Sequence, residues 1–457
     1  MTAGLEELQH RFQATLQSRV PVHIDRLRWD KERIAAHQRK QLRHLLAHAI
    51  EHSPFHSRRL AGVNPDTFEI EQLRSLPVMT KEEMMAAFDD IVTDRRLTRE
   101  RVEAHVAATG EFPTLLDGKY FALASGGSSG LKGMFVYDED SMVDYVARIT
   151  ASSGLLKNGR RFFAAVASPS ATHAGRLGFS LVDGEMTHVI HAPVTLPLHE
   201  IVHRLNEGQP DAVFAYPSVL YRLAGEQRSG RLSIRPARII VGAEQLWREA
   251  ETYISDAFGV PVYNVFASSE GLFGGSPPGE QAFRLSTDLA IIELVDEENR
   301  PVPAGTPSAR VLVTNLFNTV QPLIRYVLGD RFLRRPDASD HGHVVSTIEG
   351  RSYKTFVYQE TAIHQLTLLS SVTKAQAIVD YQIRQTPRGV DIDLLVNGRL
   401  DEALLKADIE QALAHAGLRD PQVSIRIVGG FERDSCTGKL RRLVPLSGPG
   451  AGTVTAV

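Results

Sequence analysis

Hydrophobic residues near the start of the chain recur with the period of an α-helix. Within "QLRHLLAHAIEHSPF" (41–55) they are spaced three and four positions apart, which places them on one face of a helix. We expect Pro54 to end this helix, because proline lacks the backbone N–H that the next turn would use. The apolar face consists of Leu42, Leu45, Leu46, Ala49 and Ile50.

From about residue 160 onward, short apolar runs alternate with helical patterns. Helical periodicity is present in "LHEIVHRLNE" (198–207) and "QLWREAETYISDAF" (245–258). The runs around them are almost continuously apolar, as strands covered on both faces are. This alternation predicts parallel βαβ units in a doubly wound sheet. The four runs are "RFFAAVAS" (161–168), "DAVFAYPS" (211–218), "ARIIVGAE" (237–244) and "VPVYNVFAS" (260–268).

The last third of the chain has a different pattern. The segment 289–317 predicts a hairpin around a polar turn that contains Pro and Gly. After about residue 350, "GVDIDLLVN", "DEALLKADIEQALAHAG" and "QVSIRIVGG" predict a strand, a helix and a strand. The predicted fold class is α/β. A large N-terminal domain over 1–350, helical over 1–100, carries doubly wound, mostly parallel sheets and a β-rich subdomain, and a small α+β domain covers 351–457.

Composition narrows the class of protein. The 457 residues are 43% hydrophobic and 23% charged, and a net charge of −3 gives no argument for nucleic acid or anionic lipid as a partner. One cysteine, Cys436, excludes a disulfide within the chain and suits a reducing compartment. The N-terminus has no apolar core of signal-peptide length, and no run approaches membrane-spanning length. We therefore expect a cytoplasmic enzyme.

The stretch "ALASGGSSGLKGMFVYD" (122–138) allows three interpretations. It does not match the Walker A or dinucleotide-binding templates. It does match G-x-S-x-G over Gly126–Gly130, so Ser128 is a candidate hydrolase nucleophile. It is also suited to a loop that wraps a polyphosphate, because glycines let the backbone approach and hydroxyls donate to phosphate oxygens. A flexible connection is the third interpretation.

Two histidine patterns suggest metal binding only weakly. His44, His48 and His52 fall four residues apart on one helical face, where histidines can chelate a metal, but a solvated polar face is the favoured interpretation. The loop sequence "HGH" (341–343) lacks nearby acidic or cysteine partners.

Five short segments, in order along the chain, resemble motifs of one enzyme family. The chain is similar in these motifs to the adenylate-forming superfamily of acyl-CoA synthetases, adenylation domains and luciferases, and most similar to its phenylacetate–CoA ligase branch. The matches correspond to the family's phosphate loop, Y-G-x-[ST]-E, R-Y-x-x-G-D, hinge G-R and C-terminal G-K motifs. They are "SGGSSGLKG" (125–133), "FASSE" (266–270), "RYVLGD" (325–330), "GRSYK" (350–354) and "TGKLRRL" (437–443).

The resemblance implies a reaction in two halves. A carboxylate attacks the α-phosphate of ATP to give an acyl-adenylate and pyrophosphate, and a nucleophile then takes the acyl group and releases AMP. It implies ATP, Mg²⁺ and, by default, CoA as cofactors and co-substrates. It further implies that the C-terminal domain is mobile and swings between the half-reactions about a hinge at 352–354.

The resemblance also assigns roles to residues of this chain. Lys439, Glu270 and Arg351 would act in catalysis, with Glu270 as the ligand of the metal ion. Phe266 would stack on adenine, and Asp330 would accept hydrogen bonds from the ribose hydroxyls. Nucleotide binding is assigned to Ser125, Gly126, Gly127, Ser128, Ser129, Gly130, Lys132, Gly242, Ala243, Glu244, Ala267, Ser268, Ser269 and Arg351. The acyl site is assigned to His173, Gly175, Tyr216, Ala243 and Ala267.

Four positions depart from the family's pattern. Lys132 stands in the Pro position of the phosphate loop, and Phe266 stands where the family usually has Tyr. Ala267 stands where the family has Gly, and Tyr353 at the hinge where Asp or Lys is common. The expected function is activation of an aryl or arylacetic acid followed by transfer to CoA. An amine or a carrier protein as acceptor, a serine hydrolase that uses Ser128, and a degenerate nucleotide-binding protein stay open as alternatives, as does a homodimer.

Overall fold

The computed structural model describes residues 2–125, 132–153, 161–185, 187–246, 248–335, 343–351, 355–358, 361–364, 367–368, 372, 375, 377–433 and 440–446. The chain forms two compact units. The first consists mainly of Met1–Leu246 and Ile254–Ser352, and the second mainly of Tyr353–Ser435. The domain bounds drawn above stay a prediction, and each unit is described here by itself.

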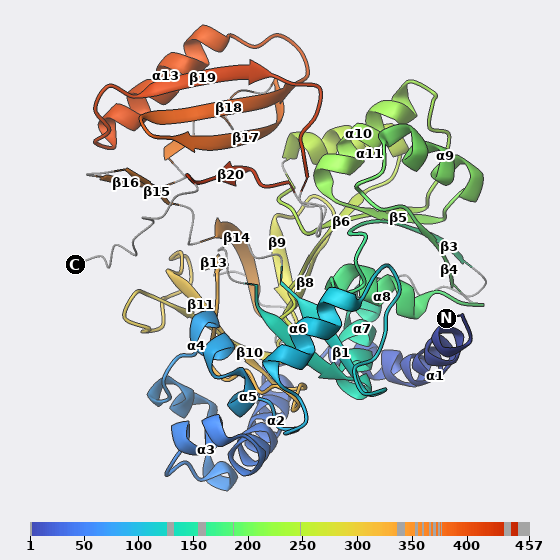
Figure 1. Ribbon diagram of the computed structural model, residues 1–457, viewed down its shortest axis with the longest axis vertical. Helices are drawn as coiled ribbons and strands as arrows, with labels where there is room; N and C mark the ends of the chain where they lie inside the picture. Colours follow the sequence, from blue (N-terminus) through green and yellow to red (C-terminus); the bar gives the residue numbers. More distant parts are fainter. Residues whose placement is uncertain are drawn as a thin grey trace. The chain divides into compact units, whose positions relative to one another are not determined.

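Helices make up the start of the first unit, as the sequence predicts (Figure 1). In α2 the predicted apolar face is buried from Leu42 to Ala49, and Ile50 is half-buried against the same cluster. The helix ends at His52, and Pro54 then occupies the first turn of α3, where its missing N–H costs nothing. The helices are α1 Thr2–Arg26, α2 Lys31–His52, α3 Pro54–Arg59, α4 Lys81–Ala86, α5 Phe88–Ile91 and α6 Arg99–Ala108, with 3₁₀ turns at Pro65–Thr67 and Ile70–Ser75.

The four apolar runs form neighbouring parallel strands of a nine-stranded sheet, which confirms the prediction. The strand order is β13-β14-β9-β8-β7-β6-β5-β3-β4. Strands β4, β3, β5, β6 and β7 are parallel, and β8, β9, β14 and β13 extend the sheet in antiparallel pairs. Their bounds are β3 Arg161–Val166, β4 Thr187–His191, β5 Ala212–Ala215, β6 Arg238–Gly242, β7 Val262–Ala267, β8 Phe273–Ser276, β9 Ala282–Leu285, β13 Asp330–Arg334 and β14 Val345–Arg351.

Helices cover both faces of the parallel strands (Figure 1). The chain runs from β3 outward to β4 and then back across β3 to β5 and β6. Because crossovers between parallel strands are right-handed, this reversal places α8 on one face and α9 and α10 on the other. The reversal point lies between β3 and β5, and ligands of such sheets bind at the carboxyl ends beside it. The helices are α7 Glu139–Ser153, α8 Ala174–Val182, α9 Leu198–Gly208, α10 Pro217–Arg228 and α11 Arg248–Phe258.

Two smaller antiparallel sheets complete the first unit. Strands β1 (Tyr120–Ala124) and β2 (Met134–Asp138) pair with each other on either side of the serine-glycine stretch. The predicted hairpin over 289–317 is also confirmed, since β10 (Ala290–Val295) pairs with β11 (Arg310–Asn315). Strand β12 (Tyr326–Leu328) joins the other edge of β11.

A buried ion pair lies between α7 and the loop before β10. The Nε atom of Arg148 donates to Oδ1 of Asp288 at 2.9 Å, and both side chains are almost fully inaccessible to solvent. The ring of His23, from α1, lies with Nδ1 3.6 Å from Oδ2 of the same carboxylate. This group joins three segments that are far apart in sequence.

The second unit has the predicted strand–helix–strand pattern. Strands β18 and β19 pair in parallel, and α13 connects them. The four-stranded sheet has the order β19-β18-β17-β20, and a separate hairpin is formed by β15 and β16. The bounds are β15 Thr355–Tyr358, β16 Thr361–His364, β17 Ile378–Thr386, β18 Gly389–Val396, α13 Glu402–His415, β19 Gln422–Ile427 and β20 Leu443–Val444.

Candidate active site

The two ends of the serine-glycine loop are held together by a pair of hydrogen bonds. The backbone N–H of Ser125 donates to the carbonyl of Gly133 at 2.8 Å, and the N–H of Gly133 donates back to Oγ of Ser125 at 2.8 Å. A side chain at Gly133 would place its Cβ 3.0 Å from the ring of Phe135, so the ring would have to shift slightly to accept it. Lys132 is exposed, and Gly126, Gly127, Ser128, Ser129 and Gly130 lie outside the described residues.

The base of this loop lies against the predicted acyl segment. The N–H of Ala124 donates to the carbonyl of Thr172 at 3.0 Å. His173 follows directly and is the N-cap residue of α8, with Gly175 in the first turn of that helix. A Cβ at Gly175 would lie 3.7 Å from Nδ1 of His173. Residues assigned to phosphate and to acyl binding are therefore neighbours at the end of β1.

Glu270 lies in a tight turn that follows β7. Its side chain is buried, with 7% of the residue exposed, and its carbonyl accepts a 2.9 Å hydrogen bond from Nδ2 of Asn315. Gly271 has a φ of +93°, and an added Cβ would contact the Asn315 amide and the ring of Phe317. The turn therefore requires glycine after Glu270. Ser268 and Ser269, in the same turn, are half-buried.

Phe266 and Asp330 belong to strands at the antiparallel end of the large sheet. Phe266 on β7 is half-buried and packs edge-on against Phe332 of β13, with ring centroids 5.6 Å apart. Asp330 opens β13 and is 8% exposed. Arg351, the last residue of β14, pairs with Asp330 across the two strands. Ala267, beside Phe266, is exposed to solvent.

The end of β6 is conformationally restricted. Gly242 could not carry a side chain, because a Cβ there would lie 2.9 Å from the carbonyl oxygen of Val265 on β7. Ala243 has a φ of 68°, a left-handed conformation that is uncommon for a residue other than glycine. Oε2 of Glu244 accepts a 2.5 Å hydrogen bond from Oγ of Ser218 at the start of α10. Strained backbone of this kind concentrates at functional sites.

Tyr216 lies at the end of β5, beside the reversal point of the sheet. Only 1% of the residue is exposed, and its ring packs edge-on against Phe214 with centroids 6.4 Å apart. Tyr216 therefore exposes very little surface that a substrate could contact, and its role in the acyl site stays a prediction. Lys439 and the hinge residues 352–354 lie outside the described residues.

Sequence reasoning missed a polar segment that fixes several of these elements. Asn315, the last residue of β11, is buried at 0–1% exposure together with Asn318 and Gln321, which lie between β11 and β12. Nδ2 of Asn318 donates to the carbonyl of Val136 at 2.9 Å. The backbone N–H of Val136 donates to Oε1 of Gln321 at 2.8 Å. The signal in the sequence was "TNLFNTVQP" (314–322), a polar run beside apolar strands.

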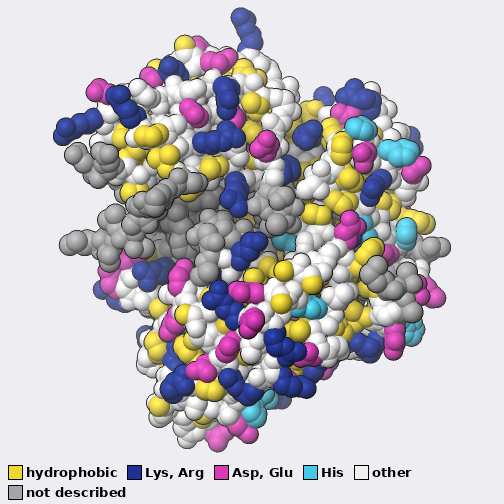
Figure 2. All heavy atoms as spheres, in the orientation of Figure 1, with side chains coloured by type: hydrophobic (Ala, Val, Ile, Leu, Met, Phe, Trp, Pro, Cys, Tyr) yellow, Lys and Arg dark blue, Asp and Glu magenta, His cyan; other side chains and the backbone are white. Residues whose placement is uncertain are grey.

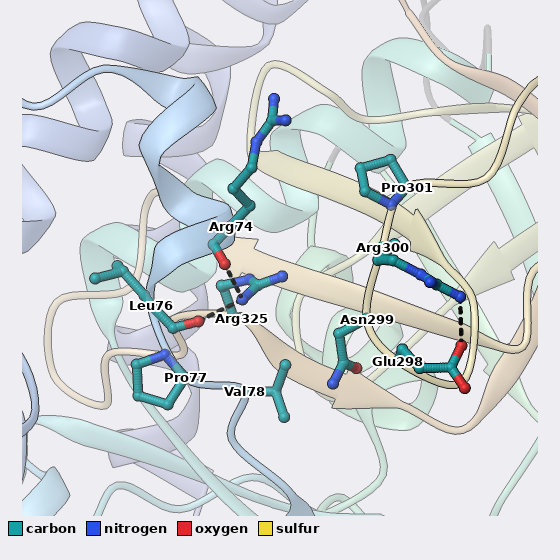
Figure 3. Close-up of a pocket in the computed structure, with 9 residues that line it drawn as sticks. All are labelled: Arg74, Leu76, Pro77, Val78, Glu298, Asn299, Arg300, Pro301 and Arg325. Atoms are coloured by element: carbon teal, nitrogen blue, oxygen red, sulfur yellow. Dashed lines mark hydrogen bonds and ion pairs between the residues drawn. The ribbon is translucent and has the colours of Figure 1, made fainter.

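Arg325, the first residue of the R-Y-x-x-G-D match, has a structural role. Its guanidinium binds both carboxylate oxygens of Glu293 at 3.0 Å and donates to the carbonyls of Arg74 and Leu76 (Figure 3). It lines an open pocket of about 450 Å³ together with Arg74, Leu76, Pro77, Val78, Glu298, Asn299, Arg300 and Pro301. The residues assigned to nucleotide binding do not line this pocket.

The described histidines do not form a metal site. His44, His48 and His52 lie along α2 with adjacent ring centroids 6.4 and 4.5 Å apart. His343 is buried, and its ring nitrogens lie 2.9 Å from Thr287 Oγ1 and 3.1 Å from the Arg26 carbonyl. Among the described residues, no three His, Cys, Asp or Glu side chains are placed to hold a metal ion.

Glu270 nevertheless fits the metal that the motif implies. A magnesium ion that binds with a nucleotide takes one or two carboxylates, the phosphate oxygens and water, and needs no cage of protein ligands. A single buried carboxylate, in a turn that is hydrogen-bonded to the strand leaving the loop, meets that requirement. No helix in the described part of the chain is both long and apolar enough to cross a bilayer. Positive and negative side chains are mixed over the face seen in Figure 2.

Comparison with known proteins agrees with the motifs. No family model matches the chain. A phenylacetate–coenzyme A ligase of Thermus thermophilus is 25% identical over 406 residues, which cover 83% of this chain and 82% of that protein. A crystal structure of 2-hydroxyisobutyryl-CoA ligase with 2-HIB-AMP aligns with a TM-score of 0.68 and 19% identity, covering 92% of this chain and 91% of that one.

A further structure shows how widely this fold is used. The amide bond synthetase McbA of Marinactinospora thermotolerans aligns with a TM-score of 0.50 and 14% identity, covering 69% of this chain and 67% of that one. The fold alone therefore leaves the acyl acceptor undecided. The resemblance inferred from the motifs is confirmed: the chain has the fold of the adenylate-forming CoA ligases and is a homologue of a phenylacetate–coenzyme A ligase.

Proposed function

We propose that the protein is an ATP-dependent, AMP-forming acid–CoA ligase. The carboxylate displaces pyrophosphate from the α-phosphorus of ATP and forms an acyl-adenylate. The CoA thiol then attacks the acyl carbon, and AMP leaves as the thioester forms. The homology to a phenylacetate–CoA ligase over most of both chains supports this reaction. A serine hydrolase based on Ser128 and a degenerate nucleotide-binding protein are not favoured, because the relatives in sequence and fold are ligases.

The observation that carries the proposal is the contact of the β1–β2 hairpin, which carries the phosphate loop, with two other motif segments. The base of the phosphate loop at Ser125 and Gly133 adjoins Thr172 on one side. Tyr137, on the strand that leaves the loop, donates a 2.7 Å hydrogen bond to the carbonyl of Ser269 in the Glu270 turn. Hydrogen bonds from one hairpin thus reach two segments that are each more than 30 residues away in sequence, and this supports a shared nucleotide site.

Each side chain has a physical task in adenylation. A carboxylate must approach a polyphosphate, so the site has to offset negative charge and align the reacting groups. Glu270 would hold the Mg²⁺ that accompanies the nucleotide and offsets the phosphate charge. Backbone N–H groups of the loop 125–133 would donate to the β- and γ-phosphates. Asp330 would fix the ribose, Phe266 would contact adenine, and Arg351 and Lys439 would supply positive charge.

The substrate acid and the acceptor are assigned by resemblance. An aryl or arylacetic acid fits the homology to the phenylacetate–CoA ligase, and CoA is the acceptor that this homology favours. The segment with His173 and Gly175, at the start of α8 and beside Thr172, is placed to meet the acid next to the phosphate loop.

A pyrophosphate-exchange screen tests the proposal. Radiolabelled pyrophosphate should enter ATP only when the enzyme forms an adenylate, so aryl, arylacetic, fatty and amino acids would be compared in parallel. Aryl or arylacetic acids should give the highest rates, and the Glu270→Gln variant should lose most of the exchange. CoA or an amine added to the active acids would then identify the acceptor by mass spectrometry. Absence of acid-dependent exchange across the panel would overturn the proposal.

A further inference from the structure

Two buried tyrosines pack against one phenylalanine and donate hydrogen bonds to the Glu270 turn. Tyr137, on β2, and Tyr145, on α7, both stack on Phe317, with ring centroids 6.1 and 6.0 Å apart and interplanar angles of 23° and 12°. Tyr137 is 1% exposed and Tyr145 is 3% exposed. We call Tyr137, Tyr145 and Phe317 the aromatic platform. Its stacked rings limit the directions in which the two hydroxyl groups can point.

Both hydroxyl groups donate to backbone carbonyls of the turn. Tyr137 donates to Ser269 at 2.7 Å, and Tyr145 donates to Ser268 at 2.9 Å. The next carbonyl, that of Glu270, accepts the 2.9 Å hydrogen bond from Nδ2 of Asn315. Three consecutive carbonyls are therefore each held by a different buried side chain. Buried carbonyls need some partner, but three side chains from three separate segments fix the path of this turn in space.

The Glu270 carboxylate also affects both tyrosines. Burial, and after it the negative charge of Glu270, raises the pKa of Tyr145. Burial, then Tyr145 and then Glu270 raise the pKa of Tyr137. Both phenols consequently stay protonated at neutral pH and remain hydrogen-bond donors. The carboxylate itself lies close enough to the platform to be felt electrostatically.

The platform is rigidly joined to the phosphate loop. Tyr137 is next to Val136, whose backbone N–H and C=O groups are both bonded to the buried amides of Gln321 and Asn318. Strand β2 begins one residue after Gly133, at the base of the loop. The position of Glu270 is therefore linked to the base of the phosphate loop through a short series of buried contacts.

We propose that Tyr137 and Tyr145 are positioning residues for adenylation, which hold the Glu270 carboxylate at a fixed place relative to the phosphate loop. This inference rests on the proposed function, in which Glu270 meets the metal ion that accompanies the nucleotide. A metal-binding carboxylate needs support from outside its own contacts, because a displacement of about 1 Å can remove much of its effect.

The test compares three Tyr→Phe variants. Tyr137→Phe and Tyr145→Phe each remove one hydroxyl and keep the stacked ring. Tyr120→Phe is the matched control, since Tyr120 is also buried, and its hydroxyl donates to Asp94 at 2.6 Å and not to the Glu270 turn. For each variant, displacement of a fluorescent nucleotide would give the Kd of ATP with saturating Mg²⁺ and with EDTA. The ratio of the two values is the metal's contribution to nucleotide affinity.

We expect each platform variant to reduce this ratio by about five- to tenfold, because the loss of one hydrogen bond would let the Glu270 carboxylate move. Tyr120→Phe should leave the ratio within about twofold of the wild-type value. In a Glu270→Gln background, Tyr145→Phe should have no further effect on the ratio, because the two changes act through one carboxylate. A merely structural role would lower the melting temperature without changing the ratio.

Equal ratios in the platform variants and the Tyr120→Phe control would overturn the inference while wild-type pyrophosphate exchange stayed intact. Additive effects of Tyr145→Phe and Glu270→Gln would also overturn it, because they would separate the tyrosine from the carboxylate. Failure of the wild-type protein to bind ATP, or to catalyse exchange with any acid, would instead overturn the proposed function. The two failures are therefore distinguishable.

Discussion

Asp330 and Arg351 lie directly opposite each other in the antiparallel pairing of β13 with β14. Asp330 is the first residue of β13 and Arg351 is the last residue of β14, so both lie at the same end of these two strands. Two motifs that are 20 residues apart in sequence thus meet by strand register alone. The residues to which the motifs assign a ribose-binding and a catalytic role are therefore register partners in this sheet.

The first prediction concerns recognition of the ribose. If Asp330 accepts hydrogen bonds from the ribose hydroxyls, the wild-type enzyme should prefer ATP to 2′-deoxyATP in pyrophosphate exchange. Asp330→Asn should reduce that preference by about tenfold, because a hydrogen bond to a charged group contributes about 1.5 kcal/mol. Asp296→Asn, in the exposed turn after β10, is the matched control. An unchanged preference in Asp330→Asn would remove Asp330 from the ribose site.

The second prediction concerns the turn that carries Glu270. Gly271→Ala should destabilise the protein and lower exchange at least tenfold, because the added Cβ would lie 3.0 Å from Cζ of Phe317 and would contact the Asn315 amide. Gly305 provides the control. It has a φ of +87°, but no atom lies within 4 Å of an added Cβ.

Gly305→Ala should therefore show only the cost of a left-handed alanine, about 1–2 kcal/mol. Thermal unfolding and exchange would be measured for both variants. If Gly271→Ala lowered stability no more than Gly305→Ala and kept its exchange activity, the close packing of the turn would be unimportant.

The elements of this fold could be predicted where the pattern reflects local physics. The parallel strands are apolar throughout because helices cover both of their faces, and that composition is visible in "ARIIVGAE". The family motifs predict the phosphate loop, Glu270 and Asp330 as parts of the site, and these assignments stay predictions. Sequence alone could not show that Tyr137 reaches Ser269, because a contact across 132 residues depends on tertiary packing.

The supporting residues could not be predicted for a related reason. Asn315, Asn318 and Gln321 have the composition of an exposed turn, yet they are buried because their amides satisfy the backbone of β2 and of the Glu270 turn. Arg325 was predicted only as part of a motif, and its ion pair with Glu293 shows that it holds the segment 74–76. Buried polar networks depend on partners that are distant in sequence, so composition does not reveal them.

The third prediction concerns the buried pair of Arg148 and Asp288. Burial alone would raise the pKa of Asp288, but the charge of Arg148 and the adjacent ring of His23 hold it well below its usual range, so the carboxylate stays ionised. Asp288→Asn would leave the Arg148 charge buried without its counter-ion. We expect a loss of about 3–5 kcal/mol, measured by urea unfolding.

Two further variants separate the charge effect from packing. Arg148→Met combined with Asp288→Leu should cost less than Asp288→Asn alone, because the double variant leaves no buried charge. Asp296→Asn removes one side of an exposed 2.8 Å pair with Arg300 and should cost much less than Asp288→Asn, because water screens the exposed charges. Equal losses for Asp288→Asn and Asp296→Asn would show that burial of the pair contributes nothing.

The last prediction concerns acid stability and His56, whose residue is fully buried. Burial lowers the pKa of His56 to about 4, while its Nε2 lies 3.0 Å from the Pro322 carbonyl. The unfolded chain, with an ordinary histidine pKa near 6.5, takes up the proton first as the pH falls. The stability that the neutral ring contributes is therefore complete above about pH 6.5 and is lost progressively down to about pH 4, by about 3 kcal/mol at most.

In His56→Gln, whose amide can still donate to Pro322, the melting temperature should fall less between pH 6.5 and pH 4 than in the wild-type protein. His203→Gln, at an exposed position beside Glu207, should keep the wild-type slope. A His56→Gln curve parallel to the wild-type curve throughout this window would mean that His56 does not set the acid limit of the fold.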